Sequence, residues 1–230
     1  MTTALNGSPG TRVAILTGGS RGAGEATARR LAARGYAVVV NYLHDQPAAE
    51  SAVEAILADN GDAVAVRADV ADDLDVTRLF AETFAAFGGI DAVVHAVGGR
   101  ITTAPVTEAG LDEFDALIRI NMRAAFIVNR EAARHLRCGG AIVNLSSSAD
   151  DATLSTHGLY AATMAMTNVL TRSLALELRE RDITVNAVSP AVHGPCLPGR
   201  VADVIAYLLS DHGHRLTGQV LNVGEAESRP

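Results

Sequence analysis

The sequence contains no lysine: all 19 basic residues of the 230-residue chain are arginine. No ammonium side chain is therefore available to any site that the chain forms. Cysteine is also scarce, since Cys138 and Cys196 are the only two, and neither has histidine or cysteine partners at the spacing of a zinc site. These absences exclude a disulfide framework and argue against a metal centre, so we expect two ordinary thiols and no bound metal.

The sequence also has little positive charge and no long apolar run. With 26 acidic residues against 19 basic ones, the formal net charge is −7, which disfavours nucleic acid and anionic membranes as partners. No apolar run approaches the roughly 20 residues that span a bilayer, and Met1 to Arg12 does not have the layout of a signal peptide. We therefore expect a cytoplasmic protein. The apolar content of 48% suits one domain spanning residues 1–230.

Short β-branched runs alternate with longer stretches of helical period, rich in Ala, Leu and Arg, from Arg12 almost to the end of the chain. This alternation predicts an α/β fold: one doubly wound Rossmann-type domain with a seven-stranded, mostly parallel sheet and helices on both faces. The strands are expected at Val13–Leu16, Ala37–Asn41, Ala63–Ala68, Ile90–His95, Ala141–Leu145, Ile183–Val188 and Val220–Val223. The helices are expected at Gly22–Arg34, Pro47–Asn60, Leu74–Phe87, Leu111–Leu136, Leu159–Arg181 and Arg200–Ser210.

Irregular structure is expected in three places. The tails, residues 1–10 and 225–230, should be flexible. Between the sixth strand and the last helix, Pro190, Pro195 and Pro198 disfavour both a helix and a strand ladder. Residues 190–200 should therefore form a surface loop.

A glycine-rich loop follows the first predicted strand and leads directly into a helix. Glycine lets the backbone turn sharply and approach a pyrophosphate, and the free N–H groups at the start of the helix favour negative charge. A lone loop of this kind is often only a tight turn, but its place in a βαβ unit favours a dinucleotide site. The residues assigned to this site are Gly18, Ser20, Arg21, Gly22, Ala23 and Gly24.

The end of the second predicted strand bears on which dinucleotide is bound. Where a carboxylate would bind the ribose hydroxyls of NAD, the chain has Asn41 and Tyr42, which would not repel a phosphate. Arg21 offers a planar, permanently charged donor for a 2′-phosphate, with His44 as a further contact. NADP(H) is therefore the predicted cofactor, while Asp45 nearby keeps NAD(H) as the alternative.

Asp69 and Val70 follow the third predicted strand. There the Asp69 carboxylate is placed to accept a hydrogen bond from the amino group of adenine. Alternatively, Asp69 is the N-cap of the next helix, a position that aspartate favours. The sequence leaves both interpretations open.

Several motifs, in order, extend the pattern over most of the chain. They are Thr17-Gly18-x-x-x-Gly22-x-Gly24, Asp69-Val70, Asn121, Ile142 to Ser147, Tyr160 and Asn186 to Pro190. Together they closely resemble the short-chain dehydrogenase/reductase family, in particular the compact subgroup that includes the 3-oxoacyl-carrier-protein reductases. The resemblance covers about Arg12 to Val223. It implies a Rossmann-type sheet and a homotetramer or homodimer built through two long helices that begin near Leu111 and Leu159.

In that family a serine orients the carbonyl or alcohol, a tyrosine transfers the proton, and an asparagine completes a water-linked relay. A lysine four residues after the tyrosine holds the nicotinamide ribose and lowers the pKa of the tyrosine. The resemblance assigns the first three roles to Ser147, Tyr160 and Asn121. For Asn121 an alternative is that its side chain holds a kink in a long helix. Met164 stands at the lysine position, so the fourth role is unfilled.

The missing lysine weakens the predicted proton relay. Methionine cannot donate to ribose hydroxyls, and it carries no charge that would favour a tyrosinate. Tyr160 should therefore titrate near 10 and be protonated at pH 7. Ketone reduction needs a protonated tyrosine and should suffer less than alcohol oxidation. Even so, the loss costs something like the ~10² to 10⁴-fold in rate that general acid–base catalysis supplies.

Other departures alter the walls of the predicted site. The family usually shows Asn-Asn-Ala-Gly after the fourth strand, but residues 95–98 read His-Ala-Val-Gly, so His95 and Ala96 form the wall beside the adenine ribose. The Pro-Gly pair behind the nicotinamide becomes Pro190-Ala191, in which Pro190 is kept as a cofactor contact. The segment after Pro190 is shorter than the family's substrate lid, so closure over a substrate is in doubt.

Three functions remain open at this point. The first is an NADP(H)-dependent reductase of a small ketone. The second is a non-redox enzyme, such as a cyclase, isomerase or lyase, that keeps Ser147 and Tyr160 as hydrogen-bonding groups. The third is a catalytically silent NADP(H)-binding partner protein. His157 and His193 are alternative acid–base groups, because histidine titrates near neutrality. The segment that would select the ketone is nearly missing.

Overall fold

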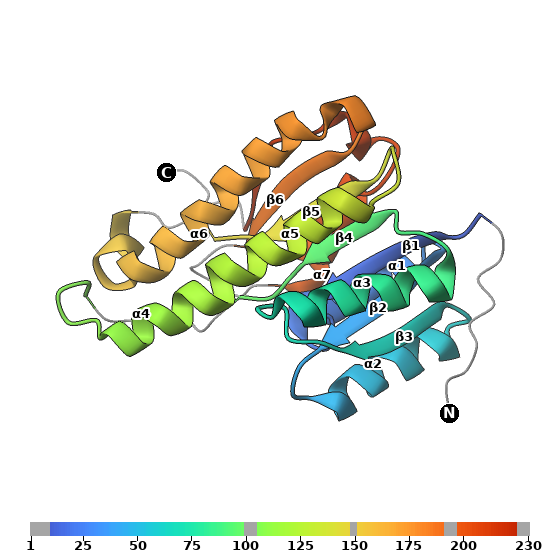
Figure 1. Cartoon of the computed structure of the whole chain (residues 1–230), viewed down its shortest axis with the longest axis horizontal. Coiled ribbons are helices and arrows are strands. Elements are labelled where there is room, and N and C mark those ends of the chain that lie inside the picture. The colour runs from blue at the N-terminus through green and yellow to red at the C-terminus, as the bar shows by residue number, and fades with distance from the viewer. Residues whose placement is uncertain (1–9, 99–104, 148–150, 191–196, 225–230) are drawn as a thin grey trace.

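A seven-stranded sheet forms the centre of the structure, a computed structural model that describes residues 10–98, 105–147, 151–190 and 197–224 (Figure 1). Its strand order is β3-β2-β1-β4-β5-β6-β7, and each neighbouring pair is parallel. The order reverses between β1 and β4, which is the switch point of a doubly wound fold. The strands are β1 Arg12–Thr17, β2 Tyr36–Tyr42, β3 Asp62–Arg67, β4 Ala92–His95, β5 Ala141–Leu145, β6 Thr184–Pro190 and β7 Val220–Val223.

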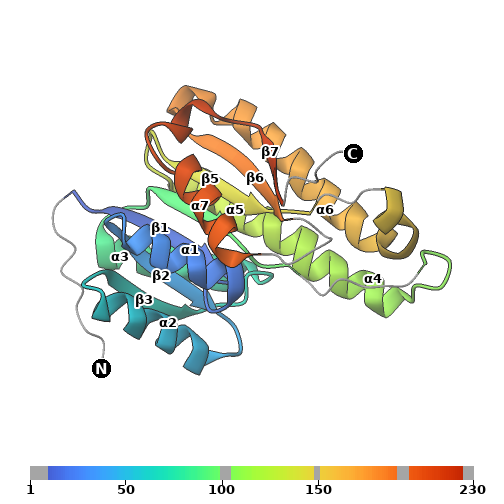
Figure 2. The same cartoon turned by 180° about the vertical axis from the view of Figure 1, so that it is seen from behind.

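Helices cover both faces of the sheet. Figure 1 shows α3, α5 and α6 in front of it, and Figure 2 shows α1 and α7 on the opposite face. The helices are α1 Gly22–Ala32, α2 Gln46–Ala58, α3 Asp73–Phe87, α4 Leu111–Leu117, α5 Ala124–His135, α6 Asp151–Glu177 and α7 Pro198–Leu208, with 3₁₀ turns η2 Arg179–Arg181 and η3 Gly213–Arg215. The predicted doubly wound α/β fold is therefore confirmed. Among the described residues, no helix is both long and apolar enough to cross a membrane.

The predicted helix Leu111–Leu136 is present, but it is not regular along its length. A π-helical segment, η1 Ile118–Arg123, joins α4 to α5. Such segments are rare and frequently accompany functional sites. Asn121 lies inside the segment and is buried. Its position agrees with the interpretation of Asn121 as a residue that holds an irregularity in a long helix.

Helix α6 begins at Asp151, well before the predicted start at Leu159. The backbone at His157 is not helical, with φ −126° and ψ 20°, so the helix is interrupted just before Leu159. Gly158 follows at once, and glycine has low helix propensity. These two residues explain why the sequence pattern identified only the part of the helix that follows them.

The prediction of a loop over residues 190–200 is wrong at both ends. Pro190 is the last residue of β6, where it pairs with Val223 of β7. At the end of a strand, the missing N–H of proline does not interrupt the ladder. Pro198 is the first residue of α7, a position that suits its fixed φ and needs no N–H donor. Residues 191–196 and most of the two predicted flexible tails lie outside the described residues.

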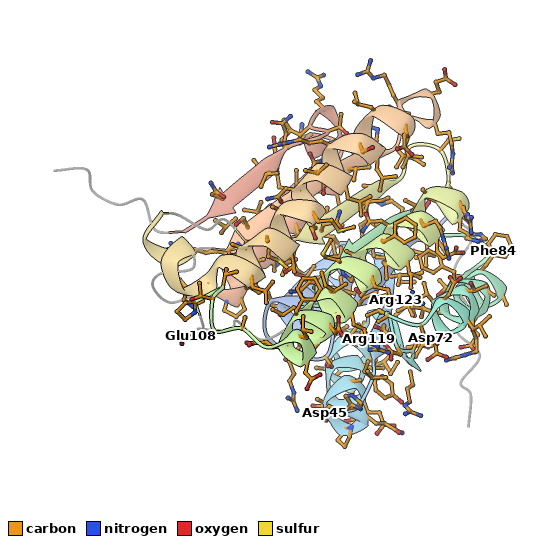
Figure 3. The ribbon with its side chains drawn as sticks, turned by 60° about the vertical axis from the view of Figure 1, so that its left-hand side comes forward. Asp45, Asp72, Phe84, Glu108, Arg119 and Arg123 are labelled. Atoms are coloured by element: carbon orange, nitrogen blue, oxygen red, sulfur yellow. The ribbon has the colours of Figure 1, made fainter. Side chains whose placement is uncertain are left out.

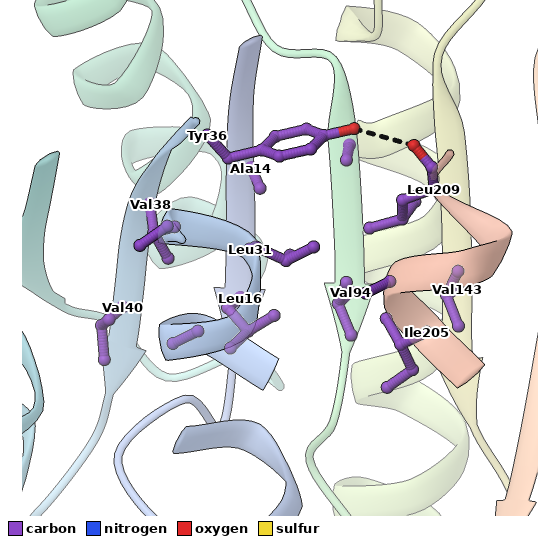
Figure 4. Packing of buried hydrophobic residues seen from close by; sticks show 14 of the residues in the cluster. Ala14, Leu16, Leu31, Tyr36, Val38, Val40, Val94, Val143, Ile205 and Leu209 are labelled. Atoms are coloured by element: carbon purple, nitrogen blue, oxygen red, sulfur yellow. Dashed lines mark hydrogen bonds between the residues drawn. The ribbon is translucent and has the colours of Figure 1, made fainter. Parts of the chain in front are cut away.

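Two apolar cores lie on the two faces of the sheet. In the first, shown in Figure 4, Leu16 of the sheet packs with Leu31 of α1 and Ile205 of α7, all fully buried. The hydroxyl of Tyr36 donates to the carbonyl oxygen of Leu209 at 3.0 Å, which ties β2 to the end of α7. The second core packs α3, α5 and α6 against the other face. Burial of these apolar surfaces is the main force that fixes both helical layers.

The helices α4 and α5, joined by η1, form one long rod over residues 111–135, called here the α4–α5 rod. Arginines connect this rod to the loop between β3 and α3. Arg119 donates to the Asp69 carboxylate at 2.6 Å, and Arg123 Nε donates to the carbonyl oxygen of Ala71 at 2.8 Å. Figure 3 shows both arginines on the side of the rod that faces the segment carrying Asp72. Because both contacts start in or next to η1, they fix the π-helical segment relative to the sheet edge.

His95, the last residue of β4, is a buried histidine with an unsatisfied nitrogen. Its side chain is 1% exposed, and Nδ1 lies 2.8 Å from the hydroxyl of Thr17 on β1. Nε2 has no hydrogen-bond partner among the described residues. Burial disfavours the charged imidazolium and lowers the pKa of His95 to about 4.

We predict that in His95→Asn the free energy of unfolding depends less on pH in the acid range than it does in the parent. In the parent, the unfolded chain binds a proton at His95 near pH 6.5 and the folded chain only near pH 4. The free energy of unfolding should therefore fall as the pH is lowered through this window, by roughly 3 kcal/mol from this residue. Asparagine can still bond to Thr17 but does not titrate. Urea unfolding between pH 4 and 7 measures the effect.

The matched control is His212→Asn, which removes an exposed histidine outside the sheet. We expect this variant to keep the acid dependence of the parent. An identical loss of stability toward acid in His95→Asn and the parent would show that His95 does not titrate between these pKa values.

Candidate active site

The carboxyl ends of β1, β2 and β4 meet at one edge of the sheet. Thr17 pairs with Asn41 on one side and with His95 on the other. The loops that leave these three strands therefore lie next to one another, at the switch point where open α/β sheets bind ligands. This register brings together the glycine loop, the end of β2 and the segment that begins with His95 and Ala96.

Close packing requires glycine at two positions of the β1–α1 loop. A Cβ on Gly18, whose φ is +69°, would lie 2.9 Å from the carbonyl oxygen of Ala96. A Cβ on Gly24 would overlap the carbonyl oxygen of Gly18. By contrast, a Cβ on Gly22 would meet no described atom within 4 Å. The loop is thus packed tightly on one side and open on the other, which fits the close approach of a pyrophosphate.

The start of α1 adds favourable electrostatics to this loop. Arg21 is the N-cap residue, and within the described chain no side chain caps the first turn of α1. The N–H groups of that turn, which includes Ala23, remain available to an anion, and the helix dipole favours negative charge there. Ser20 is half-buried, whereas the Arg21 side chain is 73% exposed and forms an ion pair with Asp45.

Asn41 turns its side chain into the protein. It is 2% exposed, and its amide donates to the carbonyl oxygens of Ala68 at 3.0 Å and Val66 at 3.3 Å. These bonds tie the end of β2 to the end of β3. Tyr42, the next residue, is half-buried. Contact of Asn41 or Tyr42 with a cofactor stays a prediction.

Asp69 lies in the β3–α3 loop, but it is not the N-cap of α3. That position belongs to Asp72, whose carboxylate accepts from the backbone N–H groups of Leu74 and Asp75 at 3.0 Å each. The alternative interpretation of Asp69 as a helix cap is therefore wrong.

The Asp69 carboxylate instead stabilises its own loop, accepting from the N–H of Ala71 at 2.9 Å and from Arg119. Burial opposes ionisation of Asp69, but these two hydrogen bonds outweigh it and lower the pKa. The neighbouring Val70 is buried, 4% exposed, so it packs beneath this loop. A contact of Asp69 with adenine stays a prediction.

Ser147 and Tyr160 are brought together from different elements. Ser147 follows β5, and Tyr160 lies in α6, three residues after the irregular backbone at His157. The Ser147 hydroxyl lies close enough to the Tyr160 phenol to act on its pKa. Burial raises the pKa of the Tyr160 phenol above its ordinary value of 10, and Ser147 partly opposes that rise. The phenol is therefore protonated at neutral pH.

Asn121 is connected to Tyr160 through Thr163, a residue that the sequence analysis did not identify. The Asn121 amide donates to the Thr163 hydroxyl at 2.9 Å, and that hydroxyl donates to the carbonyl oxygen of Tyr160 at 2.7 Å. Asn121 and Thr163 are each 1% exposed. These two hydrogen bonds link the π-helical segment to the backbone of Tyr160. The available signal was a hydroxyl one helical turn after the tyrosine.

Met164, at the position of the missing lysine, is buried. Its side chain is 4% exposed, and its carbonyl oxygen accepts from the hydroxyl of Ser146 at 3.5 Å. The pKa of Tyr160 is shifted by burial and by Ser147. Among the described residues, no guanidinium contributes to this shift.

The remaining candidates are only partly described. Pro190 ends β6 and is half-buried, whereas Ala191 and His193 lie outside the described residues. Within the described ranges, no cluster of three or more His, Cys, Asp or Glu side chains could hold a metal ion.

Residues 18–195 match the profile of a protein family described as enoyl-(acyl carrier protein) reductase. Versicolorin reductase 1 of Aspergillus parasiticus is 40% identical over 180 residues, which cover 78% of this chain and 68% of that protein. A solved dehydrogenase/reductase from Sinorhizobium meliloti superposes with a TM-score of 0.87 at 34% identity, covering 92% of this chain and 93% of that one.

A short-chain dehydrogenase of Burkholderia cenocepacia, solved in complex with NADP, gives a TM-score of 0.84 at 32% identity and covers 96% of this chain and 98% of that one. The family profile spans most of the chain, and the two solved relatives resemble it in both sequence and fold. The chain therefore belongs to the short-chain dehydrogenase/reductase family.

Proposed function

We propose that this chain binds NADP(H) and reduces the carbonyl group of a small ketone through a weakened proton relay. The observation that carries the proposal is that Ser147, after β5, and a protonated Tyr160, in α6, are neighbours at the same sheet edge as the open glycine loop. A relative named as a reductase and a similar structure that holds NADP support the same conclusion.

The residues at the sheet edge suit an NADP(H) cofactor. Gly18, Gly22 and Gly24 let the backbone and the first turn of α1 approach the pyrophosphate, and Arg21 is the donor for the 2′-phosphate. Ser20, Ala23, Asn41, Tyr42, Asp69, Val70, His95, Ala96 and Pro190 complete the proposed cofactor contacts. When bound, NADPH supplies a hydride for the carbonyl carbon.

The proton for the reduced oxygen comes from Tyr160 in this proposal. Ser147 holds the carbonyl oxygen of the substrate within reach of the phenol, and the Tyr160 hydroxyl donates its proton as the oxygen gains charge. Thr163 and Asn121 position the backbone of Tyr160. Because the pKa of Tyr160 is raised, the phenol stays a donor throughout the neutral range. Alcohol oxidation, which needs the tyrosinate, is disfavoured.

We predict that NADPH binds in a direct fluorescence titration and that Gly24→Val abolishes binding. A side chain at position 24 would overlap the Gly18 carbonyl and displace the loop. Gly199→Val, at a position in α7 where a Cβ meets no described atom within 4 Å, is the matched control and should bind as the parent does. Absence of binding to the parent at high micromolar NADPH would refute the proposed function.

We predict that Met164→Lys raises the rate of NADPH-dependent ketone reduction by ~10²-fold or more, since it restores a cation beside the phenol. The same change should lower the pKa of Tyr160, measured by ultraviolet titration against Tyr160→Phe. Met164→Leu, which keeps an apolar side chain, is the control and should match the parent. Equal and vigorous turnover in the parent and in Met164→Lys would contradict the weakened relay. Tight NADPH binding with no turnover in either would instead indicate a silent partner protein.

We further propose that the chain forms a homodimer or homotetramer through the α4–α5 rod and α6. Apolar side chains lie exposed on both, among them Phe126 on α5 at 47%, Val169 on α6 at 63% and Leu176 on α6 at 67%. Val169 and Leu176 are seven residues apart and share one helix face.

Leu176→Glu should therefore shift the protein to a smaller species in analytical ultracentrifugation. Leu57→Glu, on exposed α2, introduces the same charge elsewhere and should leave the sedimentation unchanged. A monomeric parent would refute this assembly.

A further inference from the structure

Two ion pairs connect α1 to α2, one near each end of the helices. Near the carboxyl ends, Arg29 of α1 lies 3.8 Å from Asp59, the C-cap residue of α2. At the amino ends, Arg21 pairs with Asp45, the N-cap residue of α2. The first pair is remote from the proposed site, whereas the second lies in the loops that leave β1 and β2. The two pairs thus offer a natural comparison between equivalent charges.

The Asp45 carboxylate is held in place by more than the arginine. Its Oδ1 accepts from the backbone N–H of Ala48 at 3.0 Å, which caps α2. Its Oδ2 faces the Arg21 guanidinium. The Asp45 side chain is 31% exposed and that of Arg21 is 73% exposed, so the anion is the more fixed partner. Figure 3 shows Asp45 at the end of α2.

The Arg21–Asp45 pair lies in the loops that follow β1 and β2. Thr17 and Asn41 are paired at the ends of β1 and β2, so the loops that carry Arg21 and Asp45 are neighbours. In folds of this type the ribose of a dinucleotide lies at the end of β2. A 2′-phosphate on that ribose would form an ion pair with the Arg21 guanidinium, which is already paired with Asp45.

We propose that Asp45 is a specificity-determining residue that competes with the 2′-phosphate for Arg21. The 2′-phosphate of NADPH can pair with the guanidinium only after the Asp45 carboxylate has been displaced from it. NADH has no such phosphate and leaves the Arg21–Asp45 pair intact. Asp45 therefore narrows the preference for NADPH over NADH that Arg21 alone would give. This inference rests on the proposed binding of NADP(H).

The alternative role for Asp45 has the opposite signature. A carboxylate can also accept hydrogen bonds from the 2′- and 3′-hydroxyls of the NADH ribose. In that case, removal of the charge would weaken the binding of NADH and leave the binding of NADPH little changed. The two roles are separated by which dinucleotide responds.

The experiment is a set of fluorescence titrations of NADPH and NADH at low ionic strength, with the whole chain and four variants. Asp45→Asn removes the charge but keeps an oxygen that can accept from the N–H of Ala48, so the cap of α2 is preserved. We expect Asp45→Asn to increase the affinity for NADPH about fivefold, the scale of an exposed ion pair. Its affinity for NADH should stay within twofold of that of the parent. The gain should shrink as salt is added.

The matched control and the double variant test the route of the effect. Asp59→Asn makes the same change of charge at the other end of α2 and should alter neither affinity. Arg21→Met should weaken NADPH selectively. Adding Asp45→Asn to Arg21→Met should then change NADPH affinity by less than twofold, because the contested guanidinium is gone.

Each outcome bears on a different claim. Unchanged or weaker NADPH binding in Asp45→Asn overturns the inference, and a loss confined to NADH assigns Asp45 to the ribose hydroxyls. A gain of the same size in the Arg21→Met background shows repulsion without competition for Arg21, and also overturns it. Failure of the parent to bind either dinucleotide refutes the proposed function itself, so the two failures are distinguishable.

Discussion

The whole candidate site depends on one backbone register, the parallel pairing of β1 between β2 and β4. Because Thr17 pairs with both Asn41 and His95, the three strands end together and release their loops at one place. The glycine loop can then pack against the carbonyl of Ala96, which is why Gly18 has no room for a side chain, and Gly24 in turn packs against the carbonyl of Gly18. A shift of one residue in this register would turn the side chains of β1 toward the opposite core and separate these contacts.

Arginine performs the structural tasks of positive charge in a chain that has no lysine. Arg119 and Arg123 hold the π-helical segment to the β3–α3 loop with bonds to a carboxylate and to a backbone oxygen. A planar guanidinium with several donors suits such contacts. It does not suit the one task left unfilled, at Met164, where a compact cation would have to fit into a buried position. A chain without lysine is therefore compatible with the fold of this family.

The fold was predictable because short β-branched runs alternate along the chain with longer stretches of helical period. The site was predictable to the extent that single residues identify it: Ser147 and Tyr160 are adjacent in the structure as their spacing indicated. What depends on contacts between distant segments was not. The bond from Asn121 to Thr163 joins residues 42 positions apart, and the choice of Asp72 over Asp69 as helix cap depends on local backbone angles. Pro190 was assigned to a loop because the pairing of β6 with β7 is invisible in the sequence of either strand.

The charges at the two parts of the candidate site, around Tyr160 and around Arg21, differ in opposite ways. At Tyr160 a cation is missing, so burial raises the pKa of the phenol and only the Ser147 hydroxyl counteracts it. At Arg21 an anion is already present, so the guanidinium is partnered before any cofactor arrives. Both departures act on charge and neither disturbs packing, since Met164 is well buried and Asp45 still caps α2. The chain therefore keeps the fold of its family, and on our proposals Asp45 and Met164, two positions outside the glycine loop, set its affinity for NADPH and its turnover.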